Sequence, residues 1–423
     1  MRVELLCTGD ELVTGLITDT NSTYLEARLF DLGVKVERVV LVGDVRPDIT
    51  HALLAAASRA DVVVVSGGLG PTSDDFTLEC AAAAAGVPMT EDARVLGWLR
   101  ERYAERGMSP NLNAGQLRMA RIPQGSEPVR NPAGSAPLVI LTLGRCRLFF
   151  LPGVPREYRA LLDGEVLPRI RTWLEAEPGR MHRAFRLLRT VGMGESVLDQ
   201  QVMPLAPSHP RVVFGFRTHA PENHLKLMAE APSQSEADAA LAAAEADCRR
   251  VLGASVFGAD AEEYAAALLE KLGRAKATLA AAESCTGGLI AQQLTAVPGA
   301  SSVFIGGAVV YSEKMKTAWV GVPPAVLERH TAVSRETAIA MAEGVRAACG
   351  TTYGLSVTGY AGPGGGTPED PVGTVYCALA GAGMPTRCER ITLSGDRDRV
   401  RLFAASHTLE MLRQHLLAAA ATP

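Results

Sequence analysis

The stretch VVVVSGGLGPTSDDFTLE, residues 62–79, decides the fold of the first part of this 423-residue chain. Its four valines predict a buried parallel strand, because such a strand is covered on both faces and has no polar positions. Glycines follow the strand directly, and a helix is predicted around residues 74–85. A strand, a glycine loop and a helix in this order indicate a parallel α/β sheet, in which ligands bind beyond the carboxyl ends of the strands.

The segments around this stretch repeat the same alternation. Strand-like runs at residues 3–9 and 34–43 alternate with helical stretches around residues 20–32 and 47–58. Alternation of this kind is typical of βαβ units. The N-terminal part of the chain is therefore predicted to be an α/β domain.

Two changes of pattern divide the rest of the chain. A strand, a helix, two strands and an Ala-rich helix between residues 183 and 252 predict a small α+β module. Helices and strands then alternate again up to residue 417. Since a chain of this length is too long for one core, we expect three domains. Their predicted ranges are 1–170, 171–254 and 255–423.

The composition excludes several classes of protein. A net charge of -4 gives no general attraction to nucleic acid or to an anionic membrane. The first residues become acidic too early for a signal peptide, and no apolar run is long enough to span a membrane. The eight cysteines contain no C-x-x-C pair, so neither a zinc site nor a disulfide framework is indicated. We expect a cytoplasmic protein without a membrane span.

The loop after the valine strand has the residue types of a phosphate site. Glycine lets backbone N–H groups approach an anion closely, and the N-terminus of a following helix adds a favourable dipole. The candidate binding residues are Gly67, Gly68, Gly70 and Thr72. Carboxylates that follow two of the strands are suited to a divalent cation that bridges a pyrophosphate. These candidate metal ligands are Asp10, Glu11, Asp74 and Asp75.

A simpler interpretation of the same loop remains open. Ser73 or Asp74 would cap the helix, and the glycines would only turn the chain. Neither G-x-G-x-x-G nor G-x-x-x-x-G-K-[ST] occurs in the loop. Their absence argues against a dinucleotide-binding fold and against a P-loop.

Five motifs of the N-terminal part occur in order: TGDELVTG, DTNS, SGGLGPTSDDFT, NPAGSAP and FFLPGVPREY. Together they resemble the molybdopterin-binding-like domain at the front of the CinA family, the competence/damage-inducible protein A group. The resemblance implies a three-layer α/β fold and an ADP-ribose pyrophosphatase that depends on a divalent metal ion. It also places Asn131, in the Asn-Pro motif, among the substrate-binding residues. A molybdopterin-binding role for this domain is an alternative.

The middle segment is similar to the KH-type insert of the same family. A KH domain that binds RNA uses a Gly-x-x-Gly loop, and none occurs between residues 180 and 252. The sequence VGMGES contains only Gly192 and Gly194, with one residue between them. We therefore expect no direct binding of nucleic acid, and we predict that the module is a spacer or the contact of a homodimer.

The stretch AESCTGGLI, residues 282–290, follows a predicted strand and opens a predicted helix. Thr286, Gly287 and Gly288 would then lie at a helix N-terminus, where a phosphate or a developing oxyanion is stabilised. Ser284 is a possible nucleophile, although no histidine follows at a spacing that suggests a triad. Cys285 is interpreted either as a thiolate at the helix start or as a buried structural residue.

Later residues supply a possible base and further binding groups. A lysine with a lowered pKa, assisted by a tyrosine hydroxyl, can activate a serine where histidine is absent. Tyr311 and Lys316 are the candidates for these roles. Two glycine loops near the end add the candidate substrate-binding residues Thr358, Gly359, Gly362 and Arg397. Arg397 would pair with a phosphate, or it would stay in solvent while Asp396 caps the last helix.

Six motifs cover this last part: AESCTGG, PGASS, VVYSEKMK, TGYAGPGGG, PVGTV and SGDRDRVR. They are similar to the CinA C-terminal domain, an α/β/α domain with nicotinamide mononucleotide (NMN) deamidase activity. The resemblance implies Ser301 as the nucleophile, Lys316 and Tyr311 as the pair that activates it, Ser284 in support, and no metal cofactor. Ser302 is a second candidate nucleophile, and a Ser-Ser pair before a strand is otherwise a turn or a cap.

The resemblance as a whole implies an enzyme with two activities. The C-terminal domain would hydrolyse NMN to nicotinate mononucleotide and ammonia, and the N-terminal domain would cleave ADP-ribose. The implied partners are these small nucleotides and a second copy of the chain. The alternative from a different class is an interaction protein of competence or the DNA-damage response, with inactive sites.

Overall fold

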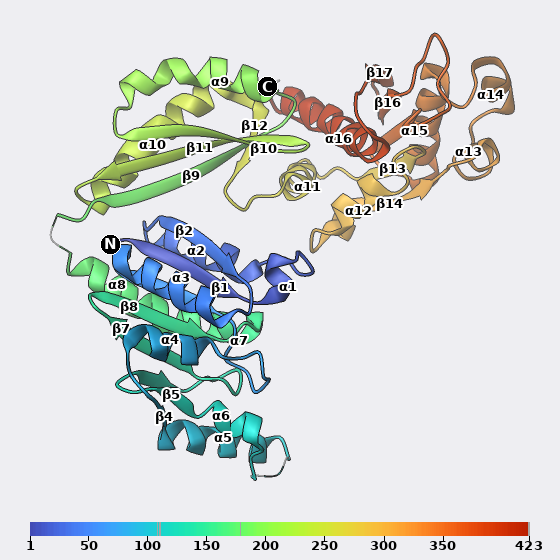
Figure 1. Cartoon of the computed structure of the whole chain (residues 1–423). Coiled ribbons are helices and arrows are strands. Elements are labelled where there is room, and N and C mark those ends of the chain that lie inside the picture. The colour runs from blue at the N-terminus through green and yellow to red at the C-terminus, as the bar shows by residue number, and fades with distance from the viewer. Residues whose placement is uncertain (108, 110, 178, 422–423) are drawn as a thin grey trace. The chain divides into compact units, whose positions relative to one another are not determined.

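The computed structural model describes residues 1–107, 109, 111–177 and 179–421. The chain divides into two compact units, Met1–Arg180 and Met181–Pro423, whose elements are labelled in Figure 1. The second unit contains two modules, and each has a sheet of its own.

A six-stranded sheet is the middle layer of the first unit. Its strands are, in spatial order, β2 (Val36–Val42), β1 (Val3–Thr8), β3 (Val62–Ser66), β8 (Cys146–Leu151), β7 (Leu138–Leu143) and β6 (Glu127–Val129). The strands β2, β1, β3 and β8 are parallel, whereas β7 runs antiparallel to both β8 and β6. Every residue of β3 is buried, as its valine run predicts.

Helices cover both faces of this sheet. One face carries α3 (Arg46–Arg59), α4 (Thr77–Ala85) and α5 (Ala93–Glu105), and the other carries α2 (Thr20–Asp31), α7 (Pro155–Leu161) and α8 (Leu167–Glu175). The predicted three-layer α/β fold is confirmed. The shorter elements are α1 (Asp10–Val13), α6 (Ala114–Arg118), β4 (Met89–Glu91), β5 (Arg121–Pro123) and a π-helical turn (Leu162–Val166).

The first unit ends later than the sequence predicts. We expected a boundary at residue 170, but α8 continues to Glu175 and the unit extends to Arg180. The reason is packing, because Ile170 and Leu174 are both buried in the same core as α2 and α7.

The middle module is a four-stranded antiparallel sheet with two main helices. The spatial order is β10 (Val212–His219), β11 (Glu222–Ala231), β9 (His182–Thr190) and β12 (Val256–Ala259). The helices α9 (Glu195–Val202) and α10 (Gln234–Leu252) pack on one face of it (Figure 1). Two 3₁₀ turns (Met203–Ser208 and Gly253–Ser255) follow these helices. The predicted α+β module is confirmed.

The boundary that we predicted after residue 254 is wrong by one strand. Strand β12 pairs with β9, through Val256 and Thr190 and through Ala259 and Leu188. The composition changes at this point of the sequence, but a short strand at a sheet edge shows no periodicity of its own. The middle module therefore extends to Ala259.

The last module is an α/β/α domain, as predicted. Its strands are, in spatial order, β14 (Phe304–Val309), β13 (Leu279–Glu283), β15 (Tyr353–Gly359), β16 (Thr374–Gly381) and β17 (Arg387–Thr392). The first three are parallel, and β16 and β17 are antiparallel additions. One face carries α11 (Tyr264–Arg274), α12 (Leu289–Thr295) and α16 (Arg397–Ala421), and the other carries α13 (Glu313–Val320), α14 (Pro324–His330) and α15 (Arg335–Cys349).

No helix in the described part of the chain is long and apolar enough to cross a membrane. All eight cysteines are free thiols, and six of them are buried. Since none is paired, the packing of the three cores holds the fold without disulfides.

Candidate active site

A serine and a lysine meet at the carboxyl ends of two neighbouring parallel strands. Ser284 directly follows β13, and Lys316 lies on α13, the helix after β14. The Nζ atom of Lys316 donates hydrogen bonds to Ser284 Oγ and to the carbonyl oxygen of Val310, both at 2.9 Å. Both side chains are buried, with 1% of Lys316 and 8% of Ser284 exposed. The pair is therefore held in one geometry and shielded from water.

Burial lowers the pKa of Lys316, because a charged ammonium group loses its hydration inside the protein. Among the described residues, no carboxylate lies within ion-pair distance of its Nζ to offset this loss. At a given pH, a larger fraction of Lys316 is therefore in the neutral form than for an exposed lysine. A neutral amine can accept a proton from the serine hydroxyl.

The cysteine beside this serine is structural. Cys285 is 5% exposed, and burial raises the pKa of its thiol to about 12. A thiol with so high a pKa stays protonated at neutral pH and is a poor nucleophile. Of the two interpretations of Cys285, the buried residue is the one that the structure supports.

A buried carboxylate occupies the N-terminus of α12. Glu283 is 1% exposed and accepts four hydrogen bonds. The donors are the hydroxyl of Thr286 and the backbone N–H groups of Gly288, Ile290 and Ala291. The prediction that an anion binds at this helix end is therefore wrong for Gly287 and Gly288, whose N–H groups donate to the Ser284 carbonyl oxygen and to Glu283. The N–H of Thr286 donates to no backbone carbonyl of the described chain.

Three of the predicted residues form an exposed polar group, in which Tyr311 follows β14 and Gly362 follows β15 at the same sheet edge as Ser284. Arg397 donates from Nη2 to the Tyr311 hydroxyl at 2.8 Å and from Nη1 to the carbonyl oxygen of Gly362 at 2.6 Å. Tyr311 is 60% exposed. Asp396 accepts a hydrogen bond from the N–H of Arg399, so it caps α16 as the alternative interpretation held. Capping by Asp396 and the contact of Arg397 with Tyr311 occur together.

Thr358 and Gly359 have structural roles. Thr358 is fully buried, and its hydroxyl donates to the carbonyl oxygen of Ala332. A Cβ atom at Gly359 would lie 2.6 Å from the carbonyl oxygen of Thr374, on the neighbouring strand. Glycine is thus required here by strand packing, and the predicted approach of this backbone to a substrate stays a prediction.

The predicted pairing of Ser301 with Lys316 is also wrong. A 3₁₀ turn, Ala300–Ser302, carries Ser301 to the amino end of β14, whereas Lys316 follows the carboxyl end of that strand. The hydroxyl of Ser302 donates to the carbonyl oxygen of Gly299, as expected of a turn. The sequence signal that could have identified the nucleophile was the position of Ser284 directly after a strand. Functional groups of parallel sheets gather at the carboxyl ends of the strands.

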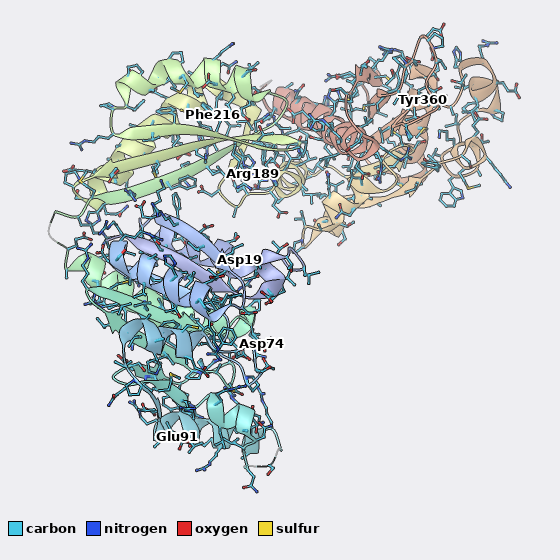
Figure 2. The ribbon with its side chains drawn as sticks, viewed as in Figure 1. Asp19, Asp74, Glu91, Arg189, Phe216 and Tyr360 are labelled. Carbon is cyan, nitrogen blue, oxygen red and sulfur yellow. The ribbon has the colours of Figure 1, made fainter. Side chains whose placement is uncertain are left out.

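A second polar site lies in the first unit. A cavity of about 510 Å³ opens beyond β1 and β3, and its lining includes Glu11, Asp74, Asp75 and the glycines 67, 68 and 70. Figure 2 labels Asp19 and Asp74, which both line it. Sequence reasoning missed other lining residues, among them Asn21 in the first turn of α2, Asp44 shortly after β2 and Ser66 at the end of β3.

The glycines of this loop allow close packing of the backbone. Gly67 and Gly68 have left-handed φ values of 107° and 67°. A Cβ atom would lie 2.4 Å from the Thr8 carbonyl oxygen at the first position and 2.0 Å from Thr77 Oγ1 at the second. Helix α4 begins at Thr77 with Phe76 as its N-cap, so Ser73 and Asp74 do not cap it as the simpler interpretation required.

The four predicted metal ligands do not form a ready metal site. Within the described residues, no three His, Cys, Asp or Glu side chains lie close enough together to hold an ion. Asp10 and Asp44 each accept a hydrogen bond from the other's backbone N–H. Asp75 accepts from both the N–H and the hydroxyl of Thr72. Burial, followed by the charges of Asp10 and other nearby carboxylates, raises the pKa of Asp44.

Asn131 and Thr72 hold loops in place, in contrast to the predicted contact with a substrate. The side-chain amide of Asn131 donates to the Ala136 carbonyl oxygen and to Glu157, and its Oδ1 accepts from the N–H groups of Ala133 and Gly134. These four hydrogen bonds use the full capacity of the amide. Thr72 donates both its N–H and its hydroxyl to Asp75.

The fold and the sites define a class: a modular α/β protein in which a small α+β module connects a domain with a polar cavity to a domain with a buried serine–lysine pair. Family models match each part. They are the probable molybdopterin binding domain over residues 4–172, the damage-inducible protein CinA KH domain over 185–258 and the CinA C-terminal domain over 261–416.

Whole-chain relatives agree with these matches. A CinA-like protein of Myxococcus xanthus is 81% identical over the full length of both chains, and one of Anaeromyxobacter is 46% identical over 98% of each. A crystal structure of CinA from Thermoplasma acidophilum is similar over 40% of this chain and 97% of its own, with 33% identity and a TM-score of 0.38. The chain belongs to the CinA family.

Proposed function

We propose that the C-terminal domain is an amidohydrolase that converts NMN to nicotinate mononucleotide and ammonia, with Ser284 as its nucleophile. The observation that carries the proposal is the buried contact of 2.9 Å between Lys316 Nζ and Ser284 Oγ. The substrate is inferred from the family resemblance. The nucleophile is inferred from this geometry, and it replaces Ser301.

The chemistry takes place in two halves. Neutral Lys316 accepts the proton of Ser284 while Oγ bonds to the carboxamide carbon of the substrate. The protonated lysine then gives this proton to the nitrogen, the C–N bond breaks, and ammonia leaves. Water adds to the ester carbon with its proton passing to Lys316, and Oγ leaves as it regains that proton. Negative charge develops on the carbonyl oxygen of the substrate during each attack, and N–H donors stabilise it. The backbone N–H groups of Cys285 and Thr286 donate to no backbone carbonyl of the described chain, so we infer that they serve as these donors.

The group of Arg397 and Tyr311 is suited to the phosphate of a mononucleotide. No carboxylate of the described residues forms an ion pair with Arg397, whose contacts are the hydroxyl of Tyr311 and the carbonyl oxygen of Gly362. An exposed guanidinium with neutral partners keeps its charge available for an anion. We infer that this group binds the phosphate.

The test is release of ammonia from NMN by the full-length chain without added metal. We expect turnover by the wild type and a loss of roughly 100-fold or more in both Ser284→Ala and Lys316→Met, since each removes a group used in every step. A matched control is Ser302→Ala, which changes only a turn hydroxyl. No ammonia from the wild type would overturn the proposal.

We propose a second activity for the N-terminal domain, the hydrolysis of the pyrophosphate of ADP-ribose with a divalent metal ion. The observation that favours it is the polar cavity of about 510 Å³, lined by the glycine loop and by several carboxylates. Since the carboxylates do not form a ready ion site, we assign no step to the metal. Formation of AMP and ribose 5-phosphate, with and without Mg²⁺ or Mn²⁺, tests the proposal.

Two alternative functions and the assembly of the chain can each be tested. Binding of a pterin to the first unit would favour the molybdopterin-binding role, and inactivity of both domains would favour an interaction protein. We also infer that the chain acts as a homodimer in the cytoplasm. The molar mass from light scattering tests the dimer.

A further inference from the structure

A cleft that the proposed reactions do not use lies between the two modules of the second unit. It has a volume of about 680 Å³. One side is formed by residues 191–195 and by the end of the β10–β11 hairpin, residues 218–223. The other side is formed by residues 391–393 at the end of β17 and by α16 from Arg399 to Glu410. Figure 1 shows the end of the hairpin beside α16.

The first side of the cleft carries an unused hydrogen-bond acceptor. Asn223 donates from Nδ2 to the carbonyl oxygen of Met193 at 2.7 Å, which fixes the orientation of its amide. Its Oδ1 atom is buried and has no hydrogen-bond partner in the described structure. A buried acceptor without a donor is costly. A bound molecule with an N–H group would remove this cost.

The opposite side carries an unneutralised positive charge. The guanidinium of Arg399 lies 4.5 Å above the ring of Phe403, and within the described chain it forms no ion pair. The acidic residues of the cleft are already engaged. Glu410 accepts from Arg413 and from the Tyr264 hydroxyl, and Glu222 pairs with Arg189. Glu195 accepts from the Thr218 hydroxyl and lies on the opposite side of the cleft from Arg399. An anion in the cleft would therefore bind at Arg399.

The lining also includes apolar side chains on both sides of the cleft. Ile391, Leu393 and Phe403 line one side, and Val191 and Pro221 line the other. A volume of this size is in the range of sites that bind small organic molecules. The occupant should thus combine a flat or apolar body with an N–H donor for Asn223 and an anionic group for Arg399.

We propose that this cleft binds a phosphorylated nucleoside whose base carries an amino or carboxamide N–H₂ group. The base lies against the apolar lining and donates to Asn223 Oδ1, and the phosphate pairs with Arg399. The site is separate from the proposed amidase site, because none of its lining residues belongs to the Ser284, Lys316, Tyr311 and Arg397 set. Adenine and nicotinamide nucleotides both have this chemistry.

The test is hydrogen–deuterium exchange of the full-length Ser284→Ala chain, in which bound NMN is not turned over. AMP and NMN are added separately, and ribose 5-phosphate serves as the ligand without a base. With AMP, NMN or both, we expect slower exchange in residues 191–195 and 218–223, which include no residue of the proposed amidase site, and the ligand that protects them identifies the base. Ribose 5-phosphate should bind at least roughly tenfold more weakly, because it lacks the donor for Asn223.

Substitutions at two positions make the result specific. Arg399→Ala and Asn223→Ala should each weaken this protection by roughly tenfold or more, and Arg399→Lys should restore part of it by keeping the charge. Arg274→Ala is the matched control, because this arginine is exposed on α11, away from the cleft. Protection confined to other regions, no protection at all, or equal affinity for ribose 5-phosphate would each overturn the proposal.

Discussion

At the scale of single residues, a serine that can act as a nucleophile is distinguished by its neighbours. Ser284 and Ser301 both lie in motifs typical of the family, and the family resemblance favoured Ser301. Only Ser284 has a buried amine within hydrogen-bond distance. A serine hydroxyl without a base remains a weak nucleophile at neutral pH. The surroundings of each serine therefore decide between them.

This assignment predicts a clear contrast between two alanine variants. Ser301→Ala should keep ammonia release within about twofold of the wild type, because Ser301 is exposed at the opposite edge of the sheet from Lys316. Ser284→Ala should lose it. Steady-state kinetics with NMN measure both variants, and a large loss in Ser301→Ala alone would return the nucleophile to Ser301.

The lowered pKa of Lys316 predicts the pH dependence of the rate. Protonated Lys316 cannot accept a proton, so kcat/KM should fall as the pH drops through its pKa and rise to a plateau above it. The inflection should lie below 10.5, the ordinary value for lysine, because burial destabilises the charged form. Rates from about pH 6 to about pH 10 check this. A flat profile, or activity in Lys316→Arg, would contradict it.

At the scale of single elements, the start of α12 shows how one carboxylate fixes a catalytic turn. Glu283 is the last residue of β13, Ser284 follows it, and the four donors to Glu283 belong to the next turn and to the first residues of α12. The carboxylate thus links the strand to the helix around the serine. The sequence placed the strand and the helix here, but it did not show that Glu283 would be the anion at the helix end.

Removal of this carboxylate should destabilise the C-terminal domain. Glu283→Ala leaves buried N–H groups without an acceptor, at a cost on the order of 2–4 kcal/mol. Glu270→Ala is the matched control, since that residue forms an exposed pair with Arg274 and should change stability by no more than about 0.5 kcal/mol. Thermal unfolding measures the two variants, and equal midpoints would show that Glu283 does not hold the turn.

At the scale of the whole molecule, the two proposed activities belong to separate compact units with separate cores. Local changes in one unit should therefore leave chemistry in the other unaffected. The middle module shares a unit with the C-terminal domain, and Arg413 of α16 donates to the carbonyl oxygen of Ala254 between them. We therefore expect a change in the middle module to affect the C-terminal domain more than it affects the first unit.

If the two activities are separate, a substitution in one site should reduce one activity and leave the other unchanged. Asp74→Asn should reduce cleavage of ADP-ribose by roughly tenfold or more, because Asp74 lines the N-terminal cavity, and it should leave ammonia release within about twofold. Ser284→Ala should show the reverse. Both assays run on the same full-length preparations, and a loss of both activities in either variant would show that the two sites are coupled.

The sequence by itself determined the kind of each domain and the order of elements. Valine runs, glycine loops and helical periodicity are local signals, and local signals suffice for strands, helices and a parallel α/β arrangement. The chemistry of the residue types and the family resemblance placed Lys316 and Tyr311 near the reactive centre as a hypothesis. The local signals failed for β12, whose identity depends on its pairing with β9.

Only the tertiary structure decided which polar groups meet. Ser284 and Lys316 are 32 positions apart, and they meet because β13 and β14 are parallel neighbours that end at the same edge. Ser301 is closer to Lys316 in sequence, yet the length of β14 separates the two. Asn131, Thr72 and Thr358 were predicted to bind substrate, but each is occupied by partners that the fold brings to it. Hydrogen-bond partners are set by spatial distance, and a sequence motif does not encode it.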